Sequence, residues 1–265
     1  MTMIIAQITD THLSDVNAAD PKFGVRAENL RACIADINDL DPLPDAVIHT
    51  GDVTQHGRAA EFAHARALLQ TLEAPLYVTP GNRDGRDGVV RAFTVDGYIM
   101  PDDAFVHYAI DEHPVRLVAV DSLGNGIGPK GDFCHDRLAA LDATLAEAPA
   151  RPTALFMHHP PFDVPAAPDP FAYQRRQAVV DLATVVSRHK QVIHIFAGHM
   201  HRPWTAMLGG VTASTVPSVA TDLRYGSYLP TNATQPVYQI HRFDGNDSFV
   251  IEPRLPGSGV GYPNT

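Results

Sequence analysis

Short apolar runs alternate with amphipathic segments over the first eighty residues of the chain. In the first amphipathic segment Leu30, Ile34 and Ile37 recur at helical spacing, so one face of a helix can be buried. The apolar runs contain β-type residues and predict strands. The expected elements are a strand at 1–8, a helix at about 25–40, a strand at 46–49, a helix at 58–72 and a strand at 75–79. This alternation is typical of an α/β sheet that is covered by helices and carries its site at the strand ends.

The pattern changes from about residue 105 onwards. Two β-type runs at 105–110 and 115–120 flank a short turn, which predicts a hairpin or two adjacent strands. Further along, the expected elements are a helix at about 136–147, a strand at 153–157, a helix at about 173–189 and a strand at 192–197.

The C-terminal part, 206–265, alternates apolar and polar residues and is expected to form antiparallel strands that complete a second sheet. These strands are expected at 211–216, 237–243 and 248–251. A loop at about 217–236 separates the first two of them, and loops of this length are commonly functional. We therefore predict a single domain over 1–265, in which this loop contributes to substrate binding or to self-association.

Composition restricts the possible partners and the compartment. The 265 residues are 45% hydrophobic and 19% charged, which is an ordinary globular balance. The net charge of −10 argues against a nucleic-acid polymer as partner, because phosphate backbones require a basic surface. No apolar stretch approaches the length of a membrane span, and residues 1–8 lack the basic region of a signal peptide. We expect a cytoplasmic protein with no membrane partner.

Five of the predicted strands are each followed by a short block of Asp, Asn or His residues. The blocks are Asp10-Thr11-His12, Gly51-Asp52, Gly81-Asn82-Arg83-Asp84, His158-His159 and Gly198-His199-Met200-His201. The first two blocks alone are weak evidence, and the last is better because His199 and His201 point the same way in an extended stretch. Five blocks placed directly after strands rarely coincide in a purely structural scaffold. A two-metal site needs one bridging carboxylate and several neutral or anionic ligands for each ion. The conjunction predicts a binuclear metal hydrolase that acts on phosphate esters.

The order and spacing of these blocks resemble those of the calcineurin-like metallophosphoesterases over roughly residues 1–205. The stretches Ile8–His12, Phe156–Pro161 and Phe196–His199 are similar to those of class III cyclic nucleotide phosphodiesterases and bacterial glycerophosphodiesterases. This resemblance implies a four-layer α/β/β/α sandwich. It also implies two metal ions, each held by part of one ligand set: Asp10, His12, Asp52 and His201 for the first ion, and Asp52, Asn82, His158 and His199 for the second.

The resemblance implies a reaction as well. Two divalent ions about 3.5–4 Å apart hold a bridging hydroxide, which attacks phosphorus while the ions neutralise the charge on the phosphoryl oxygens. Mixed nitrogen and oxygen ligands suit Mn, Fe, Co or Zn better than Ca or Mg. The expected substrate is a small phosphodiester, either a cyclic nucleotide such as cyclic AMP or a glycerophosphodiester.

One position departs from the family pattern, since Arg83 follows Asn82 where the family usually has His. Arginine does not donate a proton at neutral pH, but its planar fork can hold two phosphate oxygens. We therefore predict that Arg83 clamps the phosphate beside Asn82, and that His159 or solvent protonates the leaving group. The alternatives are that Arg83 pairs with Asp84 or Asp87 at the surface, and that His159 only packs.

Other functions remain open at this point. The Gly-Asn-Arg-Asp block also resembles that of the UDP-diacylglucosamine hydrolases, which are pyrophosphate hydrolases, and a protein phosphatase is a further alternative. A non-catalytic scaffold of the same fold should lack several ligands, whereas all seven positions are filled here. Because proteins of this family often assemble through their C-terminal segment, we also expect a homo-oligomer.

Overall fold

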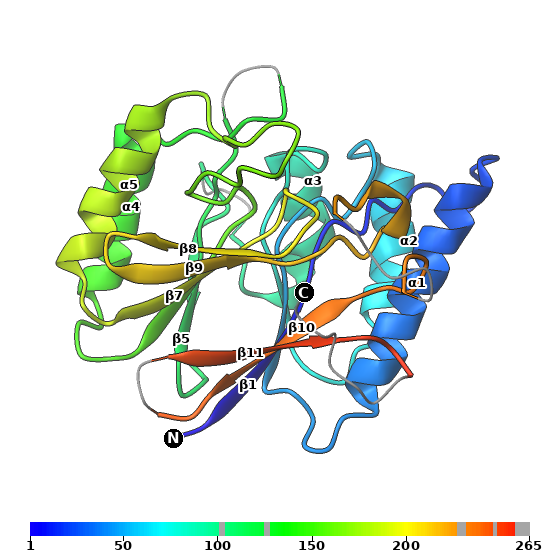
Figure 1. Ribbon diagram of the computed structural model, residues 1–265, viewed down its shortest axis with the longest axis horizontal. Coiled ribbons are helices and arrows are strands. Elements are labelled where there is room, and N and C mark those ends of the chain that lie inside the picture. Colours follow the sequence, from blue (N-terminus) through cyan, green and yellow to red (C-terminus); the bar gives the residue numbers. More distant parts are fainter. Residues whose placement is uncertain (101–103, 125–127, 227–231, 246–247, 258–265) are drawn as a thin grey trace.

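Two β-sheets lie face to face in the computed structural model, and helices cover the outer side of each sheet (Figure 1). The structure describes residues 1–100, 104–124, 128–226, 232–245 and 248–257. Helices α1 (Pro21–Asn38) and α2 (Ala59–Leu69) cover one sheet, while α4 (His135–Ala146) and α5 (Arg176–Arg188) cover the other (Figure 1). The four-layer α/β/β/α sandwich expected from the sequence is confirmed.

The first sheet has five strands in the order β11-β10-β1-β2-β3. The bounds are β1 Met3–Ile8, β2 Ala46–His49, β3 Leu76–Val78, β10 Tyr238–Phe243 and β11 Phe249–Arg254. Strands β1, β2 and β3 are parallel, so their carboxyl ends lie at the same edge of the sheet. Strands β10 and β11 continue the sheet as an antiparallel pair on the other side of β1.

The second sheet has six strands in the order β4-β5-β6-β7-β9-β8. The bounds are β4 Tyr108–Ile110, β5 Arg116–Ala119, β6 Thr153–Phe156, β7 Val192–Ala197, β8 Trp204–Leu208 and β9 Val211–Thr215. Its four central strands are parallel, and the two edge strands β4 and β8 are antiparallel to their neighbours. The hairpin expected after residue 105 is the β4–β5 pair.

Alternation along the central strands divides the apolar residues between two cores. In β6 and the residue after it, Ala154 and Phe156 face the other sheet, while Leu155 and Met157 face the helices α4 and α5. Phe196 of β7 also points into the space between the sheets. Both faces of the central strands are therefore covered, and the strand ends are left to carry polar side chains.

Helix boundaries lie within four residues of the expected ones. Helix α1 begins at Pro21 because Asp20 caps it, with Asp20 Oδ1 accepting a hydrogen bond of 3.1 Å from the Lys22 amide. Helix α3 (Arg86–Phe93) was not expected, and the short 3-10 helices η1 (Thr94–Asp96) and η2 (Thr221–Leu223) complete the order. No helix in the described ranges combines the length and the apolar character needed to cross a bilayer.

The C-terminal strands differ from the expectation in two ways. Strand β9 does lie in the second sheet, but it is parallel to β7 because the unexpected strand β8 precedes it in a hairpin. Gly209 and Gly210 form the turn of that hairpin with φ of 57° and 90°, which glycine adopts readily. Strands β10 and β11 extend the first sheet rather than the second. Of the loop at 217–236, residues 227–231 lie outside the described residues.

Candidate metal centre

The residues predicted to bind metals lie where the carboxyl ends of the two sheets meet. Asp10 and His12 follow β1, Asp52 follows β2 and Asn82 follows β3. His158 follows β6, and His199 and His201 follow β7. Cross-sheet hydrogen bonds join these loops, such as the bond of 3.0 Å from the His199 amide to Asp10 Oδ2.

The first cluster consists of Asp10, His12, Asp52 and His201, whose potential ligand atoms all lie within 4.8 Å of one another. The Nε2 atoms of His12 and His201 are 3.4 Å apart. His201 Nε2 lies 3.1 Å from Asp10 Oδ1, and His12 Nε2 lies 3.5 Å from Asp52 Oδ2. These four side chains surround a space that one ion can share.

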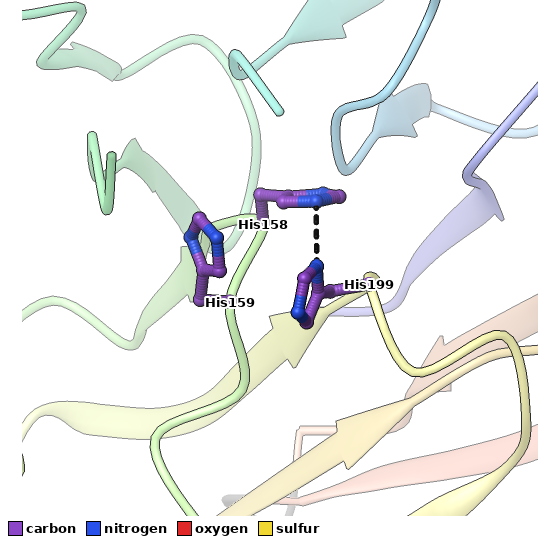
Figure 2. A group of neighbouring side chains, drawn as sticks. All are labelled: His158, His159 and His199. Carbon is purple, nitrogen blue, oxygen red and sulfur yellow. Dashed lines mark hydrogen bonds between the residues drawn. The ribbon is translucent and has the colours of Figure 1, made fainter. Parts of the chain in front are cut away.

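The second cluster is built around His158. Its Nε2 lies 3.2 Å from His199 Nδ1, 3.1 Å from Asn82 Oδ1 and 3.6 Å from Asp52 Oδ1. Figure 2 shows the His158 and His199 rings directed toward each other across this contact. Asp52 therefore turns one carboxylate oxygen toward each cluster, which is one of the arrangements in which a carboxylate bridges two ions.

The tautomers of two histidines follow from their backbone partners. His158 Nδ1 lies 2.8 Å from the Thr50 carbonyl oxygen, and His201 Nδ1 lies 2.8 Å from that of Leu223. Because a carbonyl oxygen only accepts, both rings donate from Nδ1, and a neutral ring then presents a bare Nε2 to its cluster. Burial opposes protonation of His201, but the nearby Asp10 raises the pKa of His201, so positive charge is favoured at this position. A metal cation can supply that charge in place of the proton, and the set of nitrogen and oxygen donors fits two metal ions.

Burial and charge act in opposite directions on the carboxylates. Burial raises the pKa of Asp52 to about 6, because the ionised form is poorly solvated. Burial also opposes ionisation of Asp10, but the neighbouring His201 and His12 hold the pKa of Asp10 well below its usual range. Burial lowers the pKa values of His158 and His199, which keeps these imidazoles neutral and able to bind a metal. A bound cation would favour both ionised carboxylates.

Backbone strain is concentrated in the same residues. In the described part of the chain, the non-glycine residues with positive φ are Asp10 (51°), His12 (45°), Asp52 (51°), His199 (67°) and His201 (52°). All five are predicted ligands. Left-handed conformations of such residues cost about 1–3 kcal/mol each and are retained where function requires them.

Glycines allow the strand ends to approach one another closely. A Cβ atom at Gly81 would lie 2.1 Å from the Asp52 backbone nitrogen, and one at Gly198 would lie 2.2 Å from Thr9 Oγ1. Asp84 then ties the Gly81 loop to the Asp52 loop, since its carboxylate accepts hydrogen bonds from the Val53, Thr54 and Gly81 amides at 2.8–3.0 Å. Asp84 is thus a structural link and is not a partner for Arg83.

His159 is held by the protein on both sides of its ring. Its Nδ1 lies 2.9 Å from Ser122 Oγ, and its Nε2 lies 2.8 Å from the Pro129 carbonyl oxygen. Its own carbonyl oxygen accepts a hydrogen bond of 2.8 Å from Tyr173. Although the ring lies beside His158 and His199 (Figure 2), these contacts favour the packing role over proton transfer to a leaving group.

Arg83 lies at the mouth of a cavity of about 190 Å³ that opens over both clusters. Within the described ranges its exposed guanidinium forms no ion pair or hydrogen bond, so neither alternative partner, Asp84 nor Asp87, holds it. The cavity is lined by His12, Asp52, Asn82, Arg83, Pro129, Ala167, Pro168, Asp169, His199, Met200, His201 and Tyr225. The guanidinium is therefore available to a ligand in this cavity.

Several contributions to the site were not identified from the sequence. The carbonyl oxygens of Thr50 and Leu223 orient two imidazoles, and Pro129 and Asp169 line the cavity. Backbone carbonyls carry no residue-type signal. Tyr225 belonged to the loop in which substrate contacts were expected, and its ring stacks on His201 at 5.9 Å between centroids.

The close approach at Gly81 can be tested by a pair of alanine substitutions. We expect Gly81→Ala to displace the Asp52 loop, to reduce bound metal and to destabilise the fold by roughly 1–3 kcal/mol. Gly24→Ala is the control, because nothing lies within 4 Å of a Cβ at Gly24 in α1 and the change should stabilise by up to about 1 kcal/mol. Metal content and urea unfolding measure both effects. Full metal content and stability in Gly81→Ala would contradict this account.

Comparison with known proteins gives the family that the five sequence blocks resemble. The calcineurin-like phosphoesterase family matches residues 3–203. A probable glycerophosphodiester phosphodiesterase from Arcobacter nitrofigilis is 31% identical over 98% of this chain and 96% of its own length. The 3′,5′-cyclic adenosine monophosphate phosphodiesterase of Escherichia coli is 26% identical over 83% of this chain and 77% of its own.

Solved structures agree on the fold. A dimetal phosphatase from Danio rerio superimposes with a TM-score of 0.71 at 16% identity, and the alignment covers 98% of each chain. The family resemblance read from the five sequence blocks is thus confirmed. This chain belongs to the calcineurin-like phosphoesterase family.

Proposed function

We propose that this protein is a metal-dependent phosphodiesterase that hydrolyses small phosphodiesters, such as cyclic nucleotides or glycerophosphodiesters. The observation that carries the proposal is that Asp52 turns one oxygen toward each of two ligand clusters. The names of the relatives, a glycerophosphodiester phosphodiesterase and a cyclic AMP phosphodiesterase, support the diester class.

The metal ligands follow from the two clusters. Asp10, His12 and His201 would hold one ion, Asn82, His158 and His199 would hold the other, and Asp52 would join them. When bound, two divalent cations supply positive charge for the phosphoryl oxygens and lower the pKa of a water molecule toward neutrality. Mixed imidazole, amide and carboxylate donors favour Mn, Fe, Co or Zn.

The remaining groups at the cavity would bind and orient the substrate. The Arg83 fork can hold two phosphoryl oxygens, and the Asn82 amide NH₂ can donate to another. A cavity of about 190 Å³ suits a small diester better than an extended protein segment. With both ring nitrogens of His159 engaged by Ser122 and Pro129, solvent is the better source of the leaving-group proton.

Two further expectations stay predictions, namely a cytoplasmic location and self-association through the C-terminal part. A panel of substrates distinguishes the diesterase from the alternative activities, which are a UDP-diacylglucosamine-type pyrophosphate hydrolase and a protein phosphatase. A non-catalytic scaffold is disfavoured because all seven donor residues are present and converge.

A substrate panel with controlled metal content tests the proposal. We expect the purified protein to hydrolyse bis(p-nitrophenyl) phosphate and at least one of cyclic AMP and glycerophosphoethanolamine. Activity should vanish after chelation and return with Mn²⁺ or Zn²⁺. Full activity after complete removal of metal would contradict the metal-dependent mechanism. Activity only on a UDP-linked pyrophosphate or a phosphoprotein would instead establish the corresponding alternative.

The role of Arg83 can be measured separately. Arg83→Ala should lower kcat/KM for a diester roughly 10- to 100-fold, because a charge-assisted hydrogen bond contributes about 1.5–3 kcal/mol. Metal content should not change, since among the described residues the guanidinium forms no hydrogen bond or ion pair with a predicted ligand. Arg91→Ala, at an exposed position of α3 away from the cavity, is the matched control. Unchanged diester turnover in Arg83→Ala would rule out the clamp.

A further inference from the structure

Arg26 is a buried cation in α1 that plays no part in the clusters described above. Its side chain is only 2% exposed. Its Nε and Nη2 donate to the two carboxylate oxygens of Asp222 at 2.9 and 2.6 Å. Its Nη1 donates to the His12 carbonyl oxygen at 3.1 Å and to Gln55 Oε1 at 2.6 Å. One guanidinium thus joins the loops after β1 and β2 to η2.

Asp222 belongs to a short segment that fixes the His201 ring. The next residue, Leu223, accepts the hydrogen bond of 2.8 Å from His201 Nδ1. Two residues further, the Tyr225 amide donates to the His201 carbonyl oxygen at 3.2 Å, and the Tyr225 ring stacks on the imidazole. Movement of this segment would release the imidazole that faces the first cluster.

The same segment is also tied to Asp10. Ser218 Oγ donates to the Asp10 carbonyl oxygen at 2.8 Å, and the Ala220 amide donates to the same oxygen at 3.3 Å. Asn29, one turn after Arg26 in α1, adds a second link by donating to the Val219 carbonyl oxygen at 3.2 Å. The supports of three residues of the first cluster therefore meet at α1.

The second cluster has different supports. His158 is oriented by the Thr50 carbonyl oxygen, and its neighbour His159 is held by Ser122 and Pro129. Among the described residues, the Arg26 guanidinium forms hydrogen bonds with Asp222, His12 and Gln55. It forms none with Asn82, His158 or His199, the three residues found only in the second cluster. Loss of Arg26 should therefore affect the two metal positions unequally.

We propose that Arg26 and Asp222 are positioning residues that raise the metal affinity of the first cluster, and not that of the second, by fixing His201 and the backbone of His12. The inference rests on the two-metal site of the proposed function. Groups that orient a metal ligand typically change metal affinity 10- to 100-fold when they are removed. The planar shape of the Arg26 guanidinium matters as well as its charge, because it donates hydrogen bonds to Asp222, His12 and Gln55 at the same time.

The test compares two buried arginines. Arg116 of β5 is also 2% exposed. It bonds to Thr144 and Glu147 at the end of α4 and to Asp111 after β4, none of which belongs to the clusters. Titration of metal-free protein with Mn²⁺, followed by calorimetry and metal analysis, gives the affinity of each binding step. His201→Ala identifies the step that belongs to the first cluster.

We expect Arg26→Met to lower the Mn²⁺ affinity of the first-cluster step alone, by 10- to 100-fold. Arg116→Met should leave the affinities of both steps unchanged at a comparable loss of stability. Asp222→Asn should act in the same direction as Arg26→Met, and Arg26→Lys should not restore full affinity. The two milder variants decide the question if Arg26→Met does not fold.

Three results would count against these ideas, and they are distinguishable. A wild-type protein that binds no second ion would overturn the proposed function itself. A wild-type protein with two ions and an Arg26→Met variant with the same two affinities would overturn only the positioning role. Equal weakening of both steps in Arg26→Met would show that Arg26 acts on overall stability and not on one metal position.

Discussion

The site depends on a cluster of buried carboxylates and imidazoles that needs positive charge, from a proton or from a bound metal cation, to be stable. Imidazole nitrogens and buried carboxylate oxygens face one another at 3.1–3.6 Å, and Asp52 is turned toward both clusters. Ionisation of Asp52 is unfavourable in the metal-free protein, since burial, opposed by His12 and reinforced by Asp10, raises the pKa of Asp52 to about 6. Positively charged ions at the two clusters would favour the ionised carboxylate.

The fold brings the predicted ligand residues together at one edge of the two sheets. Parallel strands in both sheets direct their carboxyl ends to one edge, and the two sheets face each other so that β1, β2 and β3 meet β6 and β7 there. The loops then adopt left-handed conformations at five of the predicted ligand residues, at a cost of about 1–3 kcal/mol each. Helix α1 contributes from outside the sheets, since Arg26 and Asn29 hold the segment that orients His201.

The parts that the sequence could predict are those that residue type encodes. Alternating strands and helices predicted the helix-covered sheets, and blocks of Asp, Asn or His after five strands predicted the converging residues. The four-layer sandwich itself followed from the family resemblance that those blocks carry. The departure at Arg83 could be noticed in the same way, because a single residue differed from a family pattern.

The parts that it could not predict depend on backbone atoms and on distant contacts. The carbonyl oxygens of Thr50 and Leu223 have no sequence signature, although they set the tautomers of two histidines. Two adjacent glycines at 209–210 are a hairpin signal, and the hairpin they close makes β9 parallel to β7 instead of antiparallel as expected. The environment of His159 could not be predicted either, because its partners Ser122 and Pro129 lie 37 and 30 residues earlier in the chain.

The central claim, two cations joined by Asp52, is tested most directly by anomalous diffraction from crystals soaked with Mn²⁺. The account predicts two anomalous peaks on opposite sides of the Asp52 carboxylate, one beside His12 and His201 and the other beside His158 and His199. A single peak, or peaks that lie away from Asp52, at saturating Mn²⁺ would contradict it.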